Sequence, residues 1–283
     1  MINLIVTDVD GTLASHEGIP ERNLEAIRYA RAKGVMFGIA TGRDYGTLLE
    51  RTEPANLTMD CAILGNGAQF VNARGEVLSS AYLDKESFIP VTDILESFDL
   101  PYMVFTTDGF YSVDPDETKN QFVTRSVLKF GAKPEDFEQG GSLSKMACAN
   151  LKPLGDKLEF LKRDLEILKV ESFSRELGPI ELGKEKLANL EGISYLSSFM
   201  DNIEITDLHA QKGFILEEAI ERFGFKKEEV MVLGDGLNDS SLFDLFEYSF
   251  APANAEEEIK AKAYKVVSSC EEGAVADAIY EMI

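Results

Sequence analysis

Two carboxylates open the first of four short segments in which charged or hydroxyl side chains sit beside glycine. Asp8 and Asp10 belong to the run DVDGT, directly after the apolar stretch Ile2–Val6. Residues i and i+2 of an extended chain share a face, so both carboxylates can point into one site. A plain Asp-Gly turn is the competing interpretation of this run when it is taken alone.

The second segment offers groups that bind anions. Thr41, Gly42 and Arg43 follow the apolar run MFGIA and precede a helical pattern. A helix N-terminus presents free backbone N–H groups to an anion, and the Thr41 hydroxyl would add a donor. Thr41 could instead serve only as the N-cap of the helix.

A lysine opens the helical run GFILEEAIERF and forms the third segment. A cation at a helix N-terminus opposes the helix dipole by roughly 0.3–1 kcal/mol. The position of Lys212 therefore indicates a compensating anion nearby, unless the side chain is simply solvated.

The fourth segment, GDGLND, follows the strand-like run VMVL. Asp235 lies between two glycines, where backbone and carboxylate can approach a ligand closely, although a Gly-Asp-Gly turn is again the alternative. Asn238 and Asp239 complete the segment, and Asp239 could instead cap the next helix.

Taken together, these segments predict a metal-assisted phosphoryl-transfer site. Asp8, Asp10, Asp235 and Asp239 could gather four carboxylates, and like charges a few ångströms apart repel by about 1 kcal/mol in water and by more when partly buried. A Mg²⁺ ion would relieve this repulsion, and Mg²⁺ also pairs with phosphate. One aspartate could attack phosphorus and a second could transfer the proton, while Lys212 stabilises negative charge. The chain has only 2 histidines, which excludes a histidine-rich metal site.

Alternating strand and helix patterns at both ends of the chain predict a parallel α/β sheet that would position these groups. The expected strands are Ile2–Val6, Val35–Ala40, Cys61–Leu64, Val230–Leu233, Tyr248–Ala251 and Lys265–Ser268. The expected helices are Glu21–Lys33, one ending near Arg51, Gly213–Arg222, Ser240–Phe246, Glu256–Ala263 and one from Glu272.

The middle of the chain has a different rhythm, with a hairpin signal at Asp108-Gly109. Its expected helices are Lys85–Phe98, Thr118–Phe130 and Asp156–Leu168, and its expected strands lie in Tyr102–Asp114, Lys145–Leu151, Val170–Ser174 and Ile193–Thr206. We therefore expect a Rossmann-like parallel-sheet core, residues 1–83 and 206–283, split by an inserted α+β domain, residues 84–205. Hinges near Leu83 and Thr206 would let this inserted domain open and close over the site.

Composition narrows the range of partners. A net charge of −22 repels nucleic acid and anionic lipid, so neither is expected to bind. The 3 cysteines are far apart in sequence and without a CxxC motif, which indicates reduced thiols in a cytoplasmic protein. No signal peptide or membrane span is expected.

The four segments, in this order, resemble the haloacid dehalogenase superfamily, in particular its Cof-type, sugar-phosphatase-like branch with a large inserted cap of the C2 type. The matching residues are Asp8–Thr12, Ala40–Arg43, Lys212–Gly213 and Gly234–Asp239. The resemblance covers essentially the whole chain, because the rhythm of the middle region is similar to that of the family's cap.

The resemblance implies a role for each residue. Asp8 would be the nucleophile, Asp10 the general acid/base and Lys212 a further catalytic group. The phosphate group would be bound by Thr41, Gly42, Lys212 and Asn238. The Mg²⁺ ligands would be Asp8, the backbone carbonyl of Asp10, and Asp235, with Arg43 and Asp239 in support.

These observations predict a Mg²⁺-dependent phosphatase acting on a small phosphate ester, with a sugar phosphate favoured. A phosphomutase of the same superfamily is the main alternative, and a non-catalytic phospho-acceptor or binding protein is a weaker one. The protein is expected to be a monomer or a weak homodimer.

Overall fold

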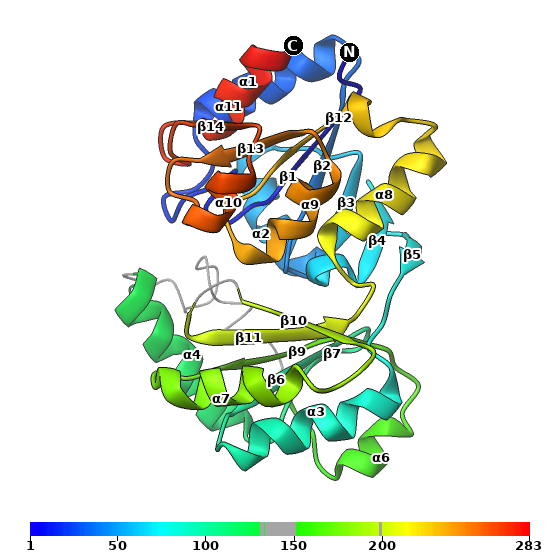
Figure 1. Cartoon of the computed structure of the whole chain (residues 1–283), viewed down its shortest axis with the longest axis vertical. Coiled ribbons are helices and arrows are strands. Elements are labelled where there is room, and N and C mark those ends of the chain that lie inside the picture. Colours follow the sequence, from blue (N-terminus) through cyan, green and yellow to red (C-terminus); the bar gives the residue numbers. More distant parts are fainter. Residues whose placement is uncertain (131–132, 134–150, 198–199) are drawn as a thin grey trace. The chain divides into compact units, whose positions relative to one another are not determined.

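The computed structural model describes residues 1–130, 133, 151–197 and 200–283, which form two compact units (Figure 1). The first unit combines Met1–Ser80 with His209–Ile283, and the second is Ala81–Leu208. The expected boundaries, after residue 83 and before residue 206, lie close to these, and the role of the second unit as a cap stays a prediction. Among the described residues, none of the helices has the length and apolar character needed to cross a bilayer.

The first unit is built on an eight-stranded sheet with the order β14-β13-β12-β1-β2-β3-β4-β5. The parallel strands are β1 (Leu4–Thr7), β2 (Met36–Ala40), β3 (Cys61–Leu64), β12 (Val230–Leu233), β13 (Tyr248–Pro252) and β14 (Lys265–Val267). The antiparallel edge consists of β4 (Gln69–Asn72) and β5 (Val77–Ser80).

The central strand β1 lies between one strand that is near in sequence and one that is remote. It pairs with β2 on one side and with β12 on the other, where Thr7 is opposite Leu233. The strand order reverses at this point, and in open α/β sheets ligands bind at the carboxyl ends of the strands beside such a reversal. The fold therefore brings the segments that follow β1, β2 and β12 to one edge.

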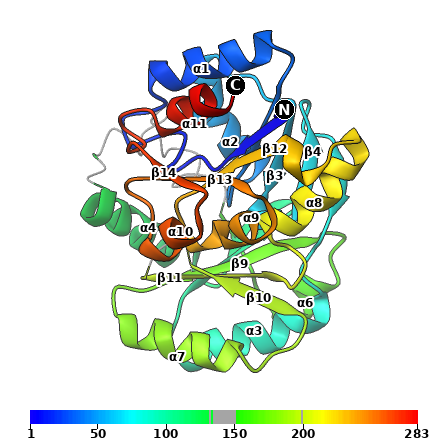
Figure 2. The same ribbon diagram turned by 45° about the horizontal axis from the view of Figure 1, so that its top comes forward.

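Helices pack on the faces of this sheet and bury their apolar residues there (Figure 2). They are α1 (Glu21–Ala32), α2 (Tyr45–Thr52), α8 (Lys212–Phe223), α9 (Ser240–Leu245), α10 (Glu257–Lys262) and α11 (Ala274–Met282). Ile27 of α1 and Ile279 of α11 belong to the same fully buried cluster as Ile5 and Met231 of the sheet. Burying one side chain of this size stabilises the fold by roughly 1.5–3 kcal/mol, because its apolar surface leaves water. This burial holds the helices against the strands.

The described residues of the second unit form a six-stranded sheet with the order β10-β11-β9-β6-β7-β8. Its strands are β6 (Tyr102–Thr106), β7 (Gly109–Ser112), β8 (Lys152–Pro153), β9 (Ile167–Phe173), β10 (Ile193–Leu196) and β11 (Asn202–Asp207). Its helices are α3 (Lys85–Ser97), α4 (Pro115–Phe130), α6 (Lys157–Leu161) and α7 (Leu177–Leu187). Figure 1 shows α3, α6 and α7 together on one face of this sheet.

Three parts of the structure differ from the sequence-based expectation, and two of them lie in the second unit. The helix expected over Asp156–Leu168 ends at Leu161, because the chain from Ile167 pairs with β6 and β11 as a strand. Helix α7 was not expected, since Gly178, Pro179 and Gly183 weaken its helical pattern, yet burial of its apolar face overrides that preference.

The third difference is the β4–β5 hairpin, which lies in the first unit. The β4–β5 hairpin is an element that the sequence patterns did not indicate, and β5 is largely exposed. The strand expected over Lys145–Leu151 falls almost entirely outside the described residues.

Candidate active site

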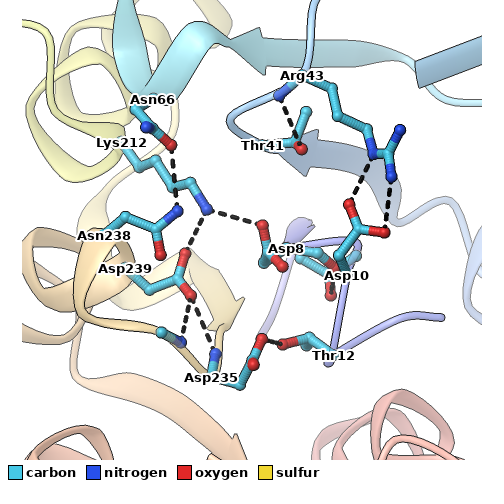
Figure 3. A network of polar contacts seen from close by, with 12 residues as sticks. Asp8, Asp10, Thr12, Thr41, Arg43, Asn66, Lys212, Asp235, Asn238 and Asp239 are labelled. Atoms are coloured by element: carbon cyan, nitrogen blue, oxygen red, sulfur yellow. Dashed lines mark hydrogen bonds and ion pairs between the residues drawn. The ribbon is translucent and has the colours of Figure 1, made fainter. Parts of the chain in front are cut away.

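Three of the four predicted carboxylates meet at the carboxyl edge of the first unit's sheet. Asp8 directly follows β1, and Asp235 and Asp239 follow β12. One oxygen from each of these three carboxylates lies within 4.8 Å of the other two (Figure 3). The pairing of β1 with β12 places Asp8 beside Asp235 and Asp239, although more than two hundred residues of chain separate Asp8 from the other two.

Lys212 is the positive charge of this cluster. It is the first residue of α8 and fully buried, with its Nζ 2.7 Å from Asp8 Oδ1 and 2.5 Å from Asp239 Oδ1. Burial lowers the pKa of Lys212, but Asp239 and Asp8 outweigh it, so the pKa lies above the ordinary value. The alternative of a solvated lysine is therefore wrong.

Asp239 holds both the lysine and the loop that carries Asp235. While Oδ1 faces Lys212, Oδ2 accepts hydrogen bonds from the backbone N–H of Asp235 at 2.9 Å and of Gly236 at 3.0 Å. Its side chain makes no capping bond to α9, so the helix-cap interpretation is also wrong. Asp239 supports the site by orienting its neighbours.

Asp235 is held by a residue that the sequence-based prediction left without a role. The Thr12 hydroxyl donates to Asp235 Oδ1 at 2.6 Å. Gly11, which precedes Thr12, has φ of +95°, and a Cβ there would lie 2.3 Å from Asp235 Oδ2, so no other residue fits without displacing the carboxylate. Thr12 belongs to the DVDGT run, and its position in that run was the sequence signal that could have identified it as a site residue.

The chemistry of the cluster fits a divalent cation. Burial raises the pKa of Asp8 to about 7, with Lys212 opposing the rise and Asp239 adding to it. Burial also raises the pKa of Asp235 well above its ordinary value, with the neighbouring Asp8 and Asp239 carboxylates contributing. Their mutual repulsion disfavours the ionised form of these neighbouring carboxylates. A hard cation that binds oxygen ligands would stabilise that ionised form.

The Asp10 side chain does not join the three clustered carboxylates. Its two oxygens accept from Arg43 Nε at 2.6 Å and from the Arg43 guanidinium at 2.9 Å, and Arg51 adds a contact at 3.1 Å. Desolvation raises the pKa of Asp10, but the two arginines outweigh it and lower the pKa to about 2. Arg51 lies near the end of α2 and nothing in the sequence pattern indicated it, because its role depends on where α2 packs.

Thr41, Gly42 and Arg43 form a loop before α2 rather than its first turn. Asp44 caps that helix by accepting from the backbone of Gly46 and Thr47, so the interpretation of Thr41 as an N-cap is wrong. The Thr41 hydroxyl is buried and accepts from the backbone N–H of Arg43 at 3.2 Å.

Asn238 is held by a second residue that the prediction did not include. Its side-chain amide donates to Asn66 Oδ1 at 3.1 Å (Figure 3). Asn66 lies in the run GNG directly after β3, and this polar run at a strand end was its only signal in the sequence.

An open α/β sheet that gathers carboxylates and a buried lysine at its carboxyl edge has the arrangement of an enzyme active site. The model of one family, described as haloacid dehalogenase-like hydrolase, matches residues 5–279. The chain therefore belongs to this family, as its motifs predicted, and its relatives, which are named as phosphatases, show that it is a phosphatase.

Individual relatives agree with this assignment over nearly their whole lengths. The 5-amino-6-(5-phospho-D-ribitylamino)uracil phosphatase YwtE of Bacillus subtilis is 27% identical over 286 residues, covering 99% of this chain and 97% of the relative. A haloacid dehalogenase-like hydrolase from B. subtilis has a similar fold, with a TM-score of 0.85, 24% identity and 100% of both chains covered. The subclass IIB sugar phosphatase BT4131 of the same superfamily aligns with a TM-score of 0.79 and 24% identity over 99% of this chain and 98% of that one.

Proposed function

We propose that this phosphatase hydrolyses a small phosphorylated metabolite, with a sugar phosphate favoured, through an aspartyl-phosphate on Asp8 and with Mg²⁺ as cofactor. The observation that carries the proposal is the pair of contacts from Lys212 to Asp8 and Asp239 beside Asp235. A buried lysine there orients the attacking carboxylate and offsets charge on a bound phosphoryl group.

The names of two relatives support the substrate class. One is a phosphatase for a phosphoribitylamino compound and the other is called a sugar phosphatase. Both names describe a phosphate carried by a polyhydroxylated carbon chain. We extend that chemistry to this chain as part of the proposal.

In the first half of the proposed reaction, an Asp8 oxygen attacks phosphorus and the bond from phosphorus to the leaving oxygen breaks. Asp10 donates a proton to that oxygen, which requires its contacts with Arg43 and Arg51 to loosen, because they favour the carboxylate form. Mg²⁺, held by Asp8, the Asp10 backbone carbonyl and Asp235, would stabilise charge on the phosphoryl oxygens.

In the second half, Asp10 as a carboxylate takes a proton from water while that water attacks phosphorus. The bond between phosphorus and Asp8 breaks, inorganic phosphate leaves and Asp8 is regenerated. The paired form of Asp10 seen in the structure is the form that this base needs.

The test is Asp8→Asn, which keeps the shape of the side chain and removes its nucleophilic oxygen. Release of phosphate from p-nitrophenyl phosphate and from a panel of sugar phosphates should fall to background while the far-ultraviolet circular dichroism is unchanged. Full activity of Asp8→Asn would contradict the mechanism. A wild-type enzyme that releases little phosphate and needs a bisphosphate activator would instead be a phosphomutase.

A further inference from the structure

Asn66 has a backbone conformation that residues other than glycine rarely adopt. It lies in the short helical turn η2 (Gly65–Gly67), with φ of 61° and ψ of 22°, and its side chain is fully buried. Asparagine tolerates this left-handed region better than most residues. Such conformations persist where the surroundings hold them, and they concentrate at functional sites.

The backbone of this turn is bonded to the loop that follows β2. The N–H of Asn66 donates to the Thr41 carbonyl at 3.0 Å, and the N–H of Gly65 donates to the Arg43 carbonyl at 3.0 Å. The turn thereby fixes the segment Thr41–Arg43, which carries two of the proposed phosphate-binding residues.

The same turn also contacts the segments that carry the other two proposed phosphate-binding residues, Asn238 and Lys212. Asn66 Oδ1 accepts from the Asn238 side-chain amide at 3.1 Å. Gly67 packs so tightly on the start of α8 that a Cβ there would lie 2.6 Å from the backbone nitrogen of Gln211, the neighbour of Lys212. Three residues therefore contact every segment proposed to bind the phosphate group.

We propose that Asn66 is a positioning residue that sets the orientation of Asn238 for the phosphate group, an inference that rests on the proposed function. The position admits glycine, asparagine or aspartate on backbone grounds. Glycine would leave the Asn238 amide without this acceptor, and aspartate would add negative charge near a bound phosphate. Asparagine alone combines the backbone conformation with a neutral acceptor.

Asn66→Gly separates the two contributions, because it keeps the left-handed backbone and removes only the side chain. We expect the melting temperature to fall only modestly, because one buried amide loses its acceptor, while kcat/KM for p-nitrophenyl phosphate falls about three- to tenfold, the range of one hydrogen bond. Asn56→Gly is the matched control, since Asn56 is also left-handed, with φ of 51°, but exposed and at the end of a different turn, Glu53–Ala55. This control should retain wild-type kinetics.

A double-mutant cycle tests whether Asn66 acts through Asn238. Asn238→Ala combined with Asn66→Gly should be no less active than Asn238→Ala alone, a coupling that a purely structural loss would not produce. Two losses that multiply in the double variant, or an Asn66→Gly enzyme with wild-type kinetics, would overturn the proposal.

Calorimetric binding of inorganic phosphate in the presence of Mg²⁺ separates this inference from the proposed function. Phosphate affinity should fall in Asn66→Gly and in Asn238→Ala, with no further loss in the double variant. An unchanged affinity in Asn66→Gly overturns the role of Asn66. A wild-type protein that hydrolyses no phosphate ester, yet shows this binding pattern, refutes the proposed function and upholds the positioning role.

Discussion

Lys212 Nζ lies 2.7 Å from Asp8 Oδ1, although 204 residues separate the two in sequence. The contact joins the end of β1 to the start of α8, the two sides of the interrupted first unit. With Asp239 it forms a buried group of one cation and two carboxylates, in which Lys212 attracts both carboxylates and offsets the repulsion between them.

Lys212→Met should therefore reduce both stability and activity. Removing the cation leaves two buried carboxylates unpaired, and losing one partner of a buried ion pair costs about 3–5 kcal/mol. We expect a lower midpoint in urea denaturation and at least a hundredfold lower kcat/KM. Lys227→Met, which removes an exposed pair with Glu217, is the control and should change neither measurement appreciably. Equal stability of the two variants would contradict the burial argument.

Stabilisation by Mg²⁺ should grow as the pH rises from 5.5 to 8. The pKa of Asp8 is raised to about 7 in the folded protein, so below that pH its proton competes with the metal. In the metal-free protein the same shift makes the folded state bind more protons than the unfolded state, so this contribution to stability decreases as pH rises from about 4 to 7. Thermal melts with and without Mg²⁺ at both pH values measure the difference. A larger Mg²⁺ effect at pH 5.5 would refute it.

Thr12→Val should weaken metal binding and leave the fold intact. The substitution keeps the shape of the side chain but removes the hydroxyl that donates to Asp235 Oδ1. Partners that orient a metal ligand typically contribute about 10–100-fold in metal affinity. A Mg²⁺ titration of activity should show half-saturation at a correspondingly higher concentration.

The control for Thr12 is another buried threonine. Thr92→Val removes a hydroxyl that donates to the Phe88 carbonyl inside α3, far in sequence from the site residues. Its half-saturating Mg²⁺ concentration should equal that of the wild type. A similar increase in both variants would show that the effect comes from general loosening of the structure.

Arg51→Gln should move the acidic limb of the pH–rate profile to higher pH. Arg51 and Arg43 together hold the pKa of Asp10 near 2, so losing one cation raises it. The carboxylate form would then persist only at higher pH, which slows the proposed second half of the reaction in acid. The profile of kcat between pH 4 and 7 measures this shift. An acidic limb identical to that of the wild type would show that Asp10 does not control it.

Most strands and helices of the first unit were predictable from the sequence because local patterns of apolar and polar residues specify them. Short apolar runs followed by Asp8, Thr41 and Asp235 indicated strands ending in polar residues, and the structure contains those strands. Helix α7 was missed because glycines and a proline within it contradict the pattern that packing imposes. Helix propensity predicts a helix poorly where burial of apolar side chains stabilises it by more than residues such as glycine and proline destabilise it.

The sequence by itself determined which groups are present and that they follow successive strands. It left open whether Lys212 is solvated, whether Asp239 caps a helix and whether Thr41 caps α2. Tertiary structure decided all three, and it also selected Arg43 and Arg51 as partners of Asp10 and Asn66 as the partner of Asn238. These choices depend on distances between side chains far apart in sequence, and only the packing of strands and helices sets those distances.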